Sequence, residues 1–112
     1  MRCLAFLIAV VALALGGSSS AFADGKNPTY VDDITPVLRQ HCMGCHGNDK
    51  QKGGLNLATY VEMQKGGGSG TVVTPGNADK SRLFTLVDHR EEPKMPSQNQ
   101  KIPAEQIALI KL

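Results

Sequence analysis

The sequence contains no tryptophan and few other aromatic side chains. Two Tyr and three Phe residues make up only 4% of its 112 residues, whereas 41% of the residues are hydrophobic. A chain of this length forms one small globular domain at most. Domains this small have a poor ratio of core to surface and usually need an additional stabilising element. We therefore expect such an element here.

A strong excess of charge of either sign is also missing. The chain has twelve Lys and Arg residues and ten Asp and Glu residues, so its formal net charge is +2. This balance gives no argument for binding to nucleic acid or to an anionic membrane surface. The glycine-rich stretch 66–76 lacks the Gly-Lys-Ser/Thr ending of a phosphate-binding loop and has no flanking strand pattern. We predict a loop there that lies against something flat.

The chain has one long hydrophobic run, and it lies at the amino terminus. A basic start is followed by an uncharged apolar run over residues 3–15 and by a small-x-small pattern at residues 21–23. We predict a signal peptide over residues 1–23, cut between Ala23 and Asp24. The run is shorter than the roughly 20 apolar residues that span a bilayer. The mature protein is thus expected to be periplasmic or otherwise exported, with no membrane anchor after cleavage.

Residues 24–112 are predicted to form one domain of the all-α class, because apolar residues recur at helical rather than alternating spacing. The first predicted helix runs from Pro36 to Cys42 with Thr35 as the cap, and the sequence leaves room for a short turn at 30–34 before it. The other predicted helices are one between Asn56 and Lys65, one from Asp79 or Ser81 to just before Glu91, and a last one from Pro103. Long loops connect them. The sequence ends inside the last predicted helix, which we expect to be truncated there.

The strongest chemical signal is the run Cys42–His46, with the sequence CMGCH. Two cysteines three residues apart can reach the two vinyl groups of one haem, and the adjacent histidine can bind the iron. The run predicts one covalently attached haem c, with Cys42 and Cys45 as anchors and His46 as the first axial ligand. The buried macrocycle would supply the stabilising element that this small domain needs.

Three other hypotheses fit the same run less well. A thioredoxin-like redox pair requires a preceding strand, for which there is no pattern. A zinc site requires more ligands than Cys42, Cys45 and His46 provide, and His41 and His89 are the other histidines. A structural disulfide is compatible with export but leaves the histidine without a role.

Met95 is the candidate for the second axial ligand. It lies between Pro93 and Pro96, which restrict the backbone of a predicted loop, and thioether ligation is common in electron-transfer haems. The alternatives are that Met95 only fills the core, or that His89 binds the iron instead. Met43 should point away from the iron, and Met63 should belong to the core.

The surroundings of the predicted haem are less well defined by the sequence. The second ring nitrogen of His46 is expected to donate to a carbonyl, for which the segment Thr71 to Pro75 is the best candidate. His41 is expected to face solvent or a haem propionate. Arg39 and Lys52 could pair with propionates, but charged residues near loops are usually only solvated.

Further motifs follow the CMGCH run in a fixed order. They are Lys52–Leu57 (KGGLNL), the glycines of 66–70, Pro75-Gly76, Ser81-Arg82-Leu83 and Met95-Pro96. Together with the CMGCH run, they resemble the planctomycete-type cytochrome c domain over about Tyr30 to Leu112. Thr71 departs from the proline that is usual in the family, and the last helix lacks the family's tryptophan-isoleucine and glycine ending.

The resemblance implies a small class I cytochrome c fold wrapped around one haem. It implies thioether bonds to Cys42 and Cys45, His46 as proximal ligand and Met95 as distal ligand. The expected function is one-electron transfer rather than enzyme catalysis, between exported redox partner proteins, after haem attachment by the cytochrome c maturation machinery. The alternative is a haem redox or sensing module at the amino terminus of a larger exported enzyme.

Overall fold

The structure is a computed structural model that describes residues 27–98 and 100–112. The predicted signal peptide and its cleavage point lie outside these residues. Within the described part of the chain, no helix is long and apolar enough to cross a membrane.

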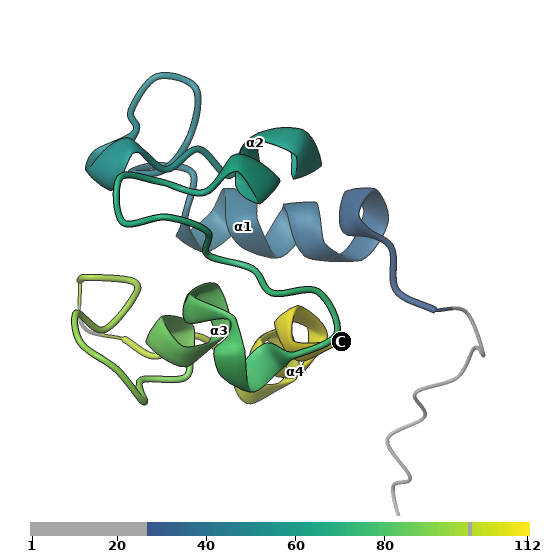
Figure 1. Ribbon diagram of the computed structural model, residues 1–112. Helices are drawn as coiled ribbons and strands as arrows, with labels where there is room; N and C mark the ends of the chain where they lie inside the picture. Colours follow the sequence, from purple (N-terminus) through teal and green to yellow (C-terminus); the bar gives the residue numbers. More distant parts are fainter. Residues whose placement is uncertain (1–26, 99) are drawn as a thin grey trace, which may run out of the picture.

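The described residues form short helices joined by long loops, and they contain no β-strand (Figure 1). The predicted all-α class is therefore confirmed for this part of the chain. In chain order the elements are the π-helical turn η1 (Tyr30–Ile34), α1 (Thr35–His41), the 3-10 turn η2 (Lys52–Gly54), α2 (Tyr60–Lys65), the 3-10 turn η3 (Ala78–Lys80), α3 (Arg82–Val87) and α4 (Ala104–Lys111).

A helical turn precedes the first helix at residues 30–34, where the sequence left room for one, but the capping residue differs from the prediction. Thr29, not Thr35, is the capping residue, because its hydroxyl accepts a hydrogen bond from the backbone N–H of Asp32 at 3.0 Å. The turn η1 runs directly into α1, so the N–H of Thr35 finds a partner in the carbonyl of Tyr30. Thr35 consequently lies inside a continuous helical segment and needs no capping role.

Helix α2 is shorter than predicted because Asn56 holds the chain before it out of helical geometry. Asn56 is buried, and its side-chain oxygen accepts a hydrogen bond from the N–H of Ala58 at 2.9 Å. Such local bonds compete with helix formation. The helix therefore begins at Tyr60, where the hydroxyl of Thr59 caps the N–H of Glu62 at 3.1 Å.

The last helix follows Pro103, as predicted, and packs on α3 through Ile107. Leu109 and Ile110 are partly buried against the same hydrophobic cluster. The side chain of Leu112, which follows the helix, is 87% exposed.

The core of the described residues consists of two hydrophobic clusters. Cluster 1 contains Val37, Phe84, Val87, Ile102 and Ile107. Cluster 2 contains Leu38, Leu57 and Met63, which confirms the expected core position of Met63. Helix α1 contributes to both clusters. In Figure 1, α1 and α2 lie above α3 and α4.

Candidate functional site

The CMGCH run forms a tight turn directly after α1. The N–H of Cys42 donates to the carbonyl of Leu38 at 2.8 Å, and the N–H of His46 donates to the carbonyl of Cys42 at 2.9 Å. Gly47 closes the turn, since a Cβ at this position would lie 2.6 Å from the backbone oxygen of Met43. Only glycine therefore fits without a shift of the backbone.

The turn is tied to the segment that follows it. The N–H of Leu57 donates to the carbonyl of His46 at 2.8 Å, and the N–H of Lys52 donates to the carbonyl of Cys45 at 2.9 Å. These bonds fix the backbone of both residues relative to the 52–57 segment. The side chains of Cys45 and His46 therefore extend from a backbone that these hydrogen bonds hold in place.

His46 carries a buried polar atom without a partner. Its Nδ1 atom is shielded from solvent and makes no hydrogen bond. The predicted bond to a carbonyl in the segment Thr71 to Pro75 is not formed, so that prediction is wrong for this structure. Two carbonyls of this segment bind near the start of α3 instead: that of Val72 accepts from the N–H of Leu83 at 2.8 Å, and that of Thr74 accepts from the Ser81 hydroxyl at 3.1 Å.

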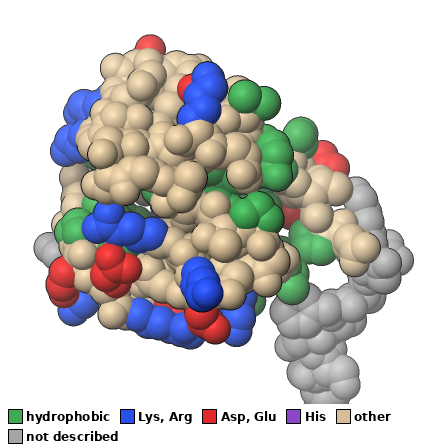
Figure 2. Space-filling model, in the orientation of Figure 1, with side chains coloured by type: hydrophobic (Ala, Val, Ile, Leu, Met, Phe, Trp, Pro, Cys, Tyr) green, Lys and Arg blue, Asp and Glu red, His purple; other side chains and the backbone are tan. Residues whose placement is uncertain are grey.

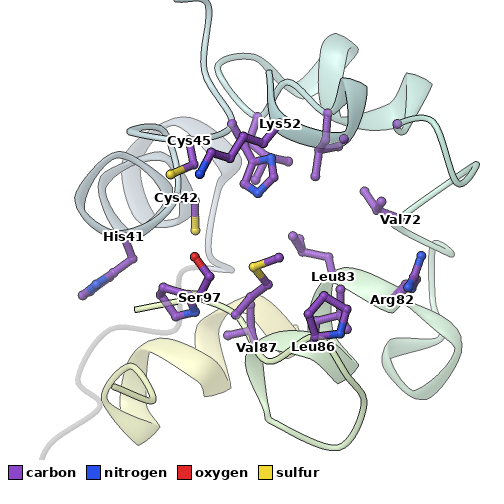
Figure 3. Close-up of a pocket in the computed structure, with 18 of the residues that line it drawn as sticks. His41, Cys42, Cys45, Lys52, Val72, Arg82, Leu83, Leu86, Val87 and Ser97 are labelled. Carbon is purple, nitrogen blue, oxygen red and sulfur yellow. The ribbon is translucent and has the colours of Figure 1, made fainter. Parts of the chain in front are cut away.

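A cavity of about 820 Å³ lies beside the turn. This volume is within the roughly 300–1,000 Å³ range of small-molecule and cofactor sites. One wall is the CMGCH turn, and the facing wall is α3 with the loop that follows it (Figure 3). The lining residues that carry the argument are Cys42, Cys45, His46, Leu83, Leu86 and Met95. In Figure 3, Leu83, Leu86 and Val87 lie across the cavity from Cys42.

The cavity brings together three of the predicted haem-binding residues on one wall and the fourth on the other. Cys42, Cys45 and His46 come from the turn after α1, whereas Met95 comes from the loop after α3. His89, the rival ligand, does not line the cavity; its Nε2 atom lies 3.1 Å from the carbonyl oxygen of Met95. Met43 packs against cluster 2 and is likewise outside the lining.

The charged side chains at the cavity are basic. Among the described residues that line it are Lys50, Lys52 and Arg82, and no Asp or Glu. Arg82 is partly neutralised by Glu91, at 3.0 Å. The site therefore favours a ligand with negative groups at its rim. Elsewhere the charges are mixed: Figure 2 shows basic and acidic side chains interspersed on the face in view.

His41 borders the cavity but is held by another helix. Its Nε2 atom lies 2.8 Å from the side-chain oxygen of Gln106 in α4, and Figure 3 shows its ring pointing away from the cavity. The ring is half-buried and points away from the cavity interior. Arg39 is exposed and does not line the cavity.

The chemistry of the cysteines bears on the competing hypotheses. Cys42 and Cys45 are both free thiols, and burial raises the pKa of Cys42 to about 11. A redox-active pair needs a lowered pKa instead, because the thiolate is the reactive form. In the described residues, no group of three or more His, Cys, Asp or Glu side chains is arranged to hold a metal ion. Both observations disfavour the thioredoxin-like and zinc hypotheses.

The sequence did not reveal how the glycine-rich loop is placed. The N–H of Gly68 donates to the carbonyl of Gly53 at 2.7 Å, and a Cβ on Gly67 would lie 2.9 Å from the same oxygen. The two glycine segments therefore touch backbone to backbone, and Gly53, Gly67 and Gly70 all border the cavity. The repeated glycines of the KGGLNL and 66–70 motifs were the only signal for this contact.

The donor set and the cavity fit a haem c. Two thiols on one turn suit the two vinyl groups, an adjacent imidazole that lines the cavity suits the iron, and apolar α3 side chains suit the macrocycle.

Comparison with known proteins supports the same conclusion. The family model for planctomycete cytochrome C matches residues 42–98, just over half of the chain. The match begins at Cys42 and includes Met95. Neither a curated protein nor a solved structure matches the chain. The chain belongs to the planctomycete cytochrome c family.

Proposed function

We propose that this protein is an exported one-electron carrier with a single haem c, bound through Cys42 and Cys45 and ligated by His46 and Met95. The observation that carries the proposal is the cavity itself. It has the two thiols and the imidazole on one wall and a thioether residue on the facing wall, and its lining is otherwise largely apolar. Membership of the cytochrome c family supports haem-based electron transfer as the class of function.

Each residue has a separate task in this proposal. Cys42 and Cys45 would hold the cofactor covalently, and His46 would bind the iron from the side of the turn. A haem bound there would supply Fe(III)/Fe(II) chemistry, and Met95 ligation would raise its reduction potential relative to two histidine ligands. The protein's own contribution is ligation, orientation and burial, so no side chain is assigned an acid or base role.

The apolar wall of the cavity would also influence the reduction potential of the haem. Leu83, Leu86 and Val87 face the cavity from α3 and would exclude water from the macrocycle. Exclusion of water disfavours the more highly charged oxidised state and so also raises the potential. We therefore propose redox partners at the oxidising end of an exported electron-transfer chain. Lys50 and Lys52 lie at the rim, where a propionate can meet them.

The test is an optical study of the full chain after expression with a cytochrome c maturation system. The proposal predicts the reduced spectrum of a low-spin haem c, a weak near-infrared sulfur-to-iron band in the oxidised state, and no binding of carbon monoxide to the reduced state. A colourless product would contradict the proposal. Ready binding of carbon monoxide would contradict the electron-carrier function and favour the alternative, a haem sensing module.

A further inference from the structure

His89 occupies an unusual backbone position at the end of α3. Its φ is +61°, in the left-handed region that non-glycine residues rarely adopt. The N–H of Arg90 donates to the carbonyl of Thr85 at 2.9 Å, and the N–H of His89 donates to the carbonyl of Leu86 at 3.2 Å. This pair of bonds is the Schellman arrangement, in which the residue at the position of His89 is usually glycine.

A histidine at this position costs conformational free energy that glycine would avoid. The side chain must therefore provide a compensating interaction, or the position is merely strained. The structure contains such an interaction. The ring Nε2 of His89 lies 3.1 Å from the carbonyl oxygen of Met95. Because a carbonyl oxygen can only accept, Nε2 is the donor.

Met95 is thereby held at both of its backbone polar groups. Its N–H donates to the carbonyl of Leu86 at 3.1 Å, and its own carbonyl accepts from His89. Both contacts lead to the carboxyl end of α3, whose Leu86 and Val87 line the cavity. The position of Met95 is thus fixed to the same helix that forms the wall across from Cys42.

Two ion pairs hold the ends of this loop. Arg82 pairs with Glu91 at 3.0 Å, and Lys101 pairs with Asp88 at 2.8 Å. Their side chains are substantially exposed, apart from that of Asp88, and exposed ion pairs contribute little to stability. Neither pair touches Met95, so they restrain the ends of the loop rather than the candidate ligand.

We propose that His89 is a positioning residue that holds the backbone of Met95 so that its thioether stays at the iron. The inference rests on the proposed function, in which Met95 is the distal ligand. His89 itself does not bind the iron. Loss of the hydrogen bond frees the Met95 carbonyl, and external ligands then compete more easily for the metal.

Two variants of the holoprotein separate this role from a general effect on folding. His89→Gly removes the donor and relieves the left-handed backbone. His89→Gln keeps a side-chain N–H donor and the same backbone cost. Lys101→Gln is the control, because it removes a link in the same loop without touching Met95. The measurements are the sulfur-to-iron band, imidazole binding to the oxidised protein, and the thermal midpoint.

His89→Gly should weaken the band and raise the affinity for imidazole by about 2- to 10-fold, the worth of one hydrogen bond, while the thermal midpoint does not fall. His89→Gln and Lys101→Gln should both stay close to the wild type in band and affinity. An unchanged band and affinity in His89→Gly, or a Gln variant that behaves like the Gly variant, would overturn the proposal. Absence of the band from the wild type would instead refute the assignment of Met95.

Discussion

Val37 and Leu38 are consecutive in α1 but belong to different hydrophobic clusters. Val37 packs with Phe84 and Val87 of α3, whereas Leu38 packs with Leu57 and Met63. The cavity is lined by members of both clusters, Val87 from one and Leu57 from the other. Helix α1 therefore joins the two halves of the core, and a haem in the cavity would join them a second time.

Leu38 should be among the most sensitive core positions, because its side chain is 0% exposed. Leu38→Ala is expected to lower the free energy of unfolding of the holoprotein by about 2–5 kcal/mol, from lost burial and the cavity left behind. Chemical denaturation checks this. Val31→Ala is the control, because Val31 is 72% exposed and its loss should change stability by less than about 0.5 kcal/mol. Equal effects of the two substitutions would contradict the proposed core.

Gly47→Ala should disturb the CMGCH turn, because the new Cβ would lie 2.6 Å from the carbonyl oxygen of Met43. We expect a loss of about 1–3 kcal/mol in stability and a lower yield of haem-loaded protein. Gly44→Ala is a matched control in the same turn, since nothing lies within 4 Å of a Cβ built there. The ratio of haem absorbance to protein in cells reports the effect. A Gly44 variant as impaired as the Gly47 variant would argue against the close contact as the cause.

Met95→Leu should remove the sulfur-to-iron band, lower the reduction potential and open the reduced protein to carbon monoxide, because leucine has a similar volume but no sulfur. Redox titration and optical spectra measure these changes. Met63→Leu is the control, since Met63 is buried in cluster 2, and it should leave potential and band unchanged. If Met95→Leu keeps the wild-type spectrum, another group is the distal ligand.

The sequence identified four candidate residues that the structure places together. Two cysteines and a histidine stand out by their spacing, and Met95 stands out because prolines flank it closely. The structure brings all four to one cavity. Their assignment as haem anchors and ligands remains a prediction, which the family match supports as a class of protein.

Other features depend on tertiary contacts that cannot be recognised in a single sequence. Asn56 lies in an apolar pattern that suggests a helix. Its side chain is buried and accepts a hydrogen bond from the backbone N–H of Ala58, so α2 begins only at Tyr60. His89 was recognisable only as a possible ligand, because its contact with Met95 depends on how the end of α3 meets a loop six residues further on.

The mass of the denatured protein tests the central claim most directly. Full-length protein is produced with a cytochrome c maturation system, acid-denatured, extracted to remove loosely bound haem and weighed by mass spectrometry. The account predicts the polypeptide from Asp24 plus one haem, and it predicts that a Cys42→Ala, Cys45→Ala double variant has no adduct. A wild-type protein with the mass of the bare polypeptide would contradict the account.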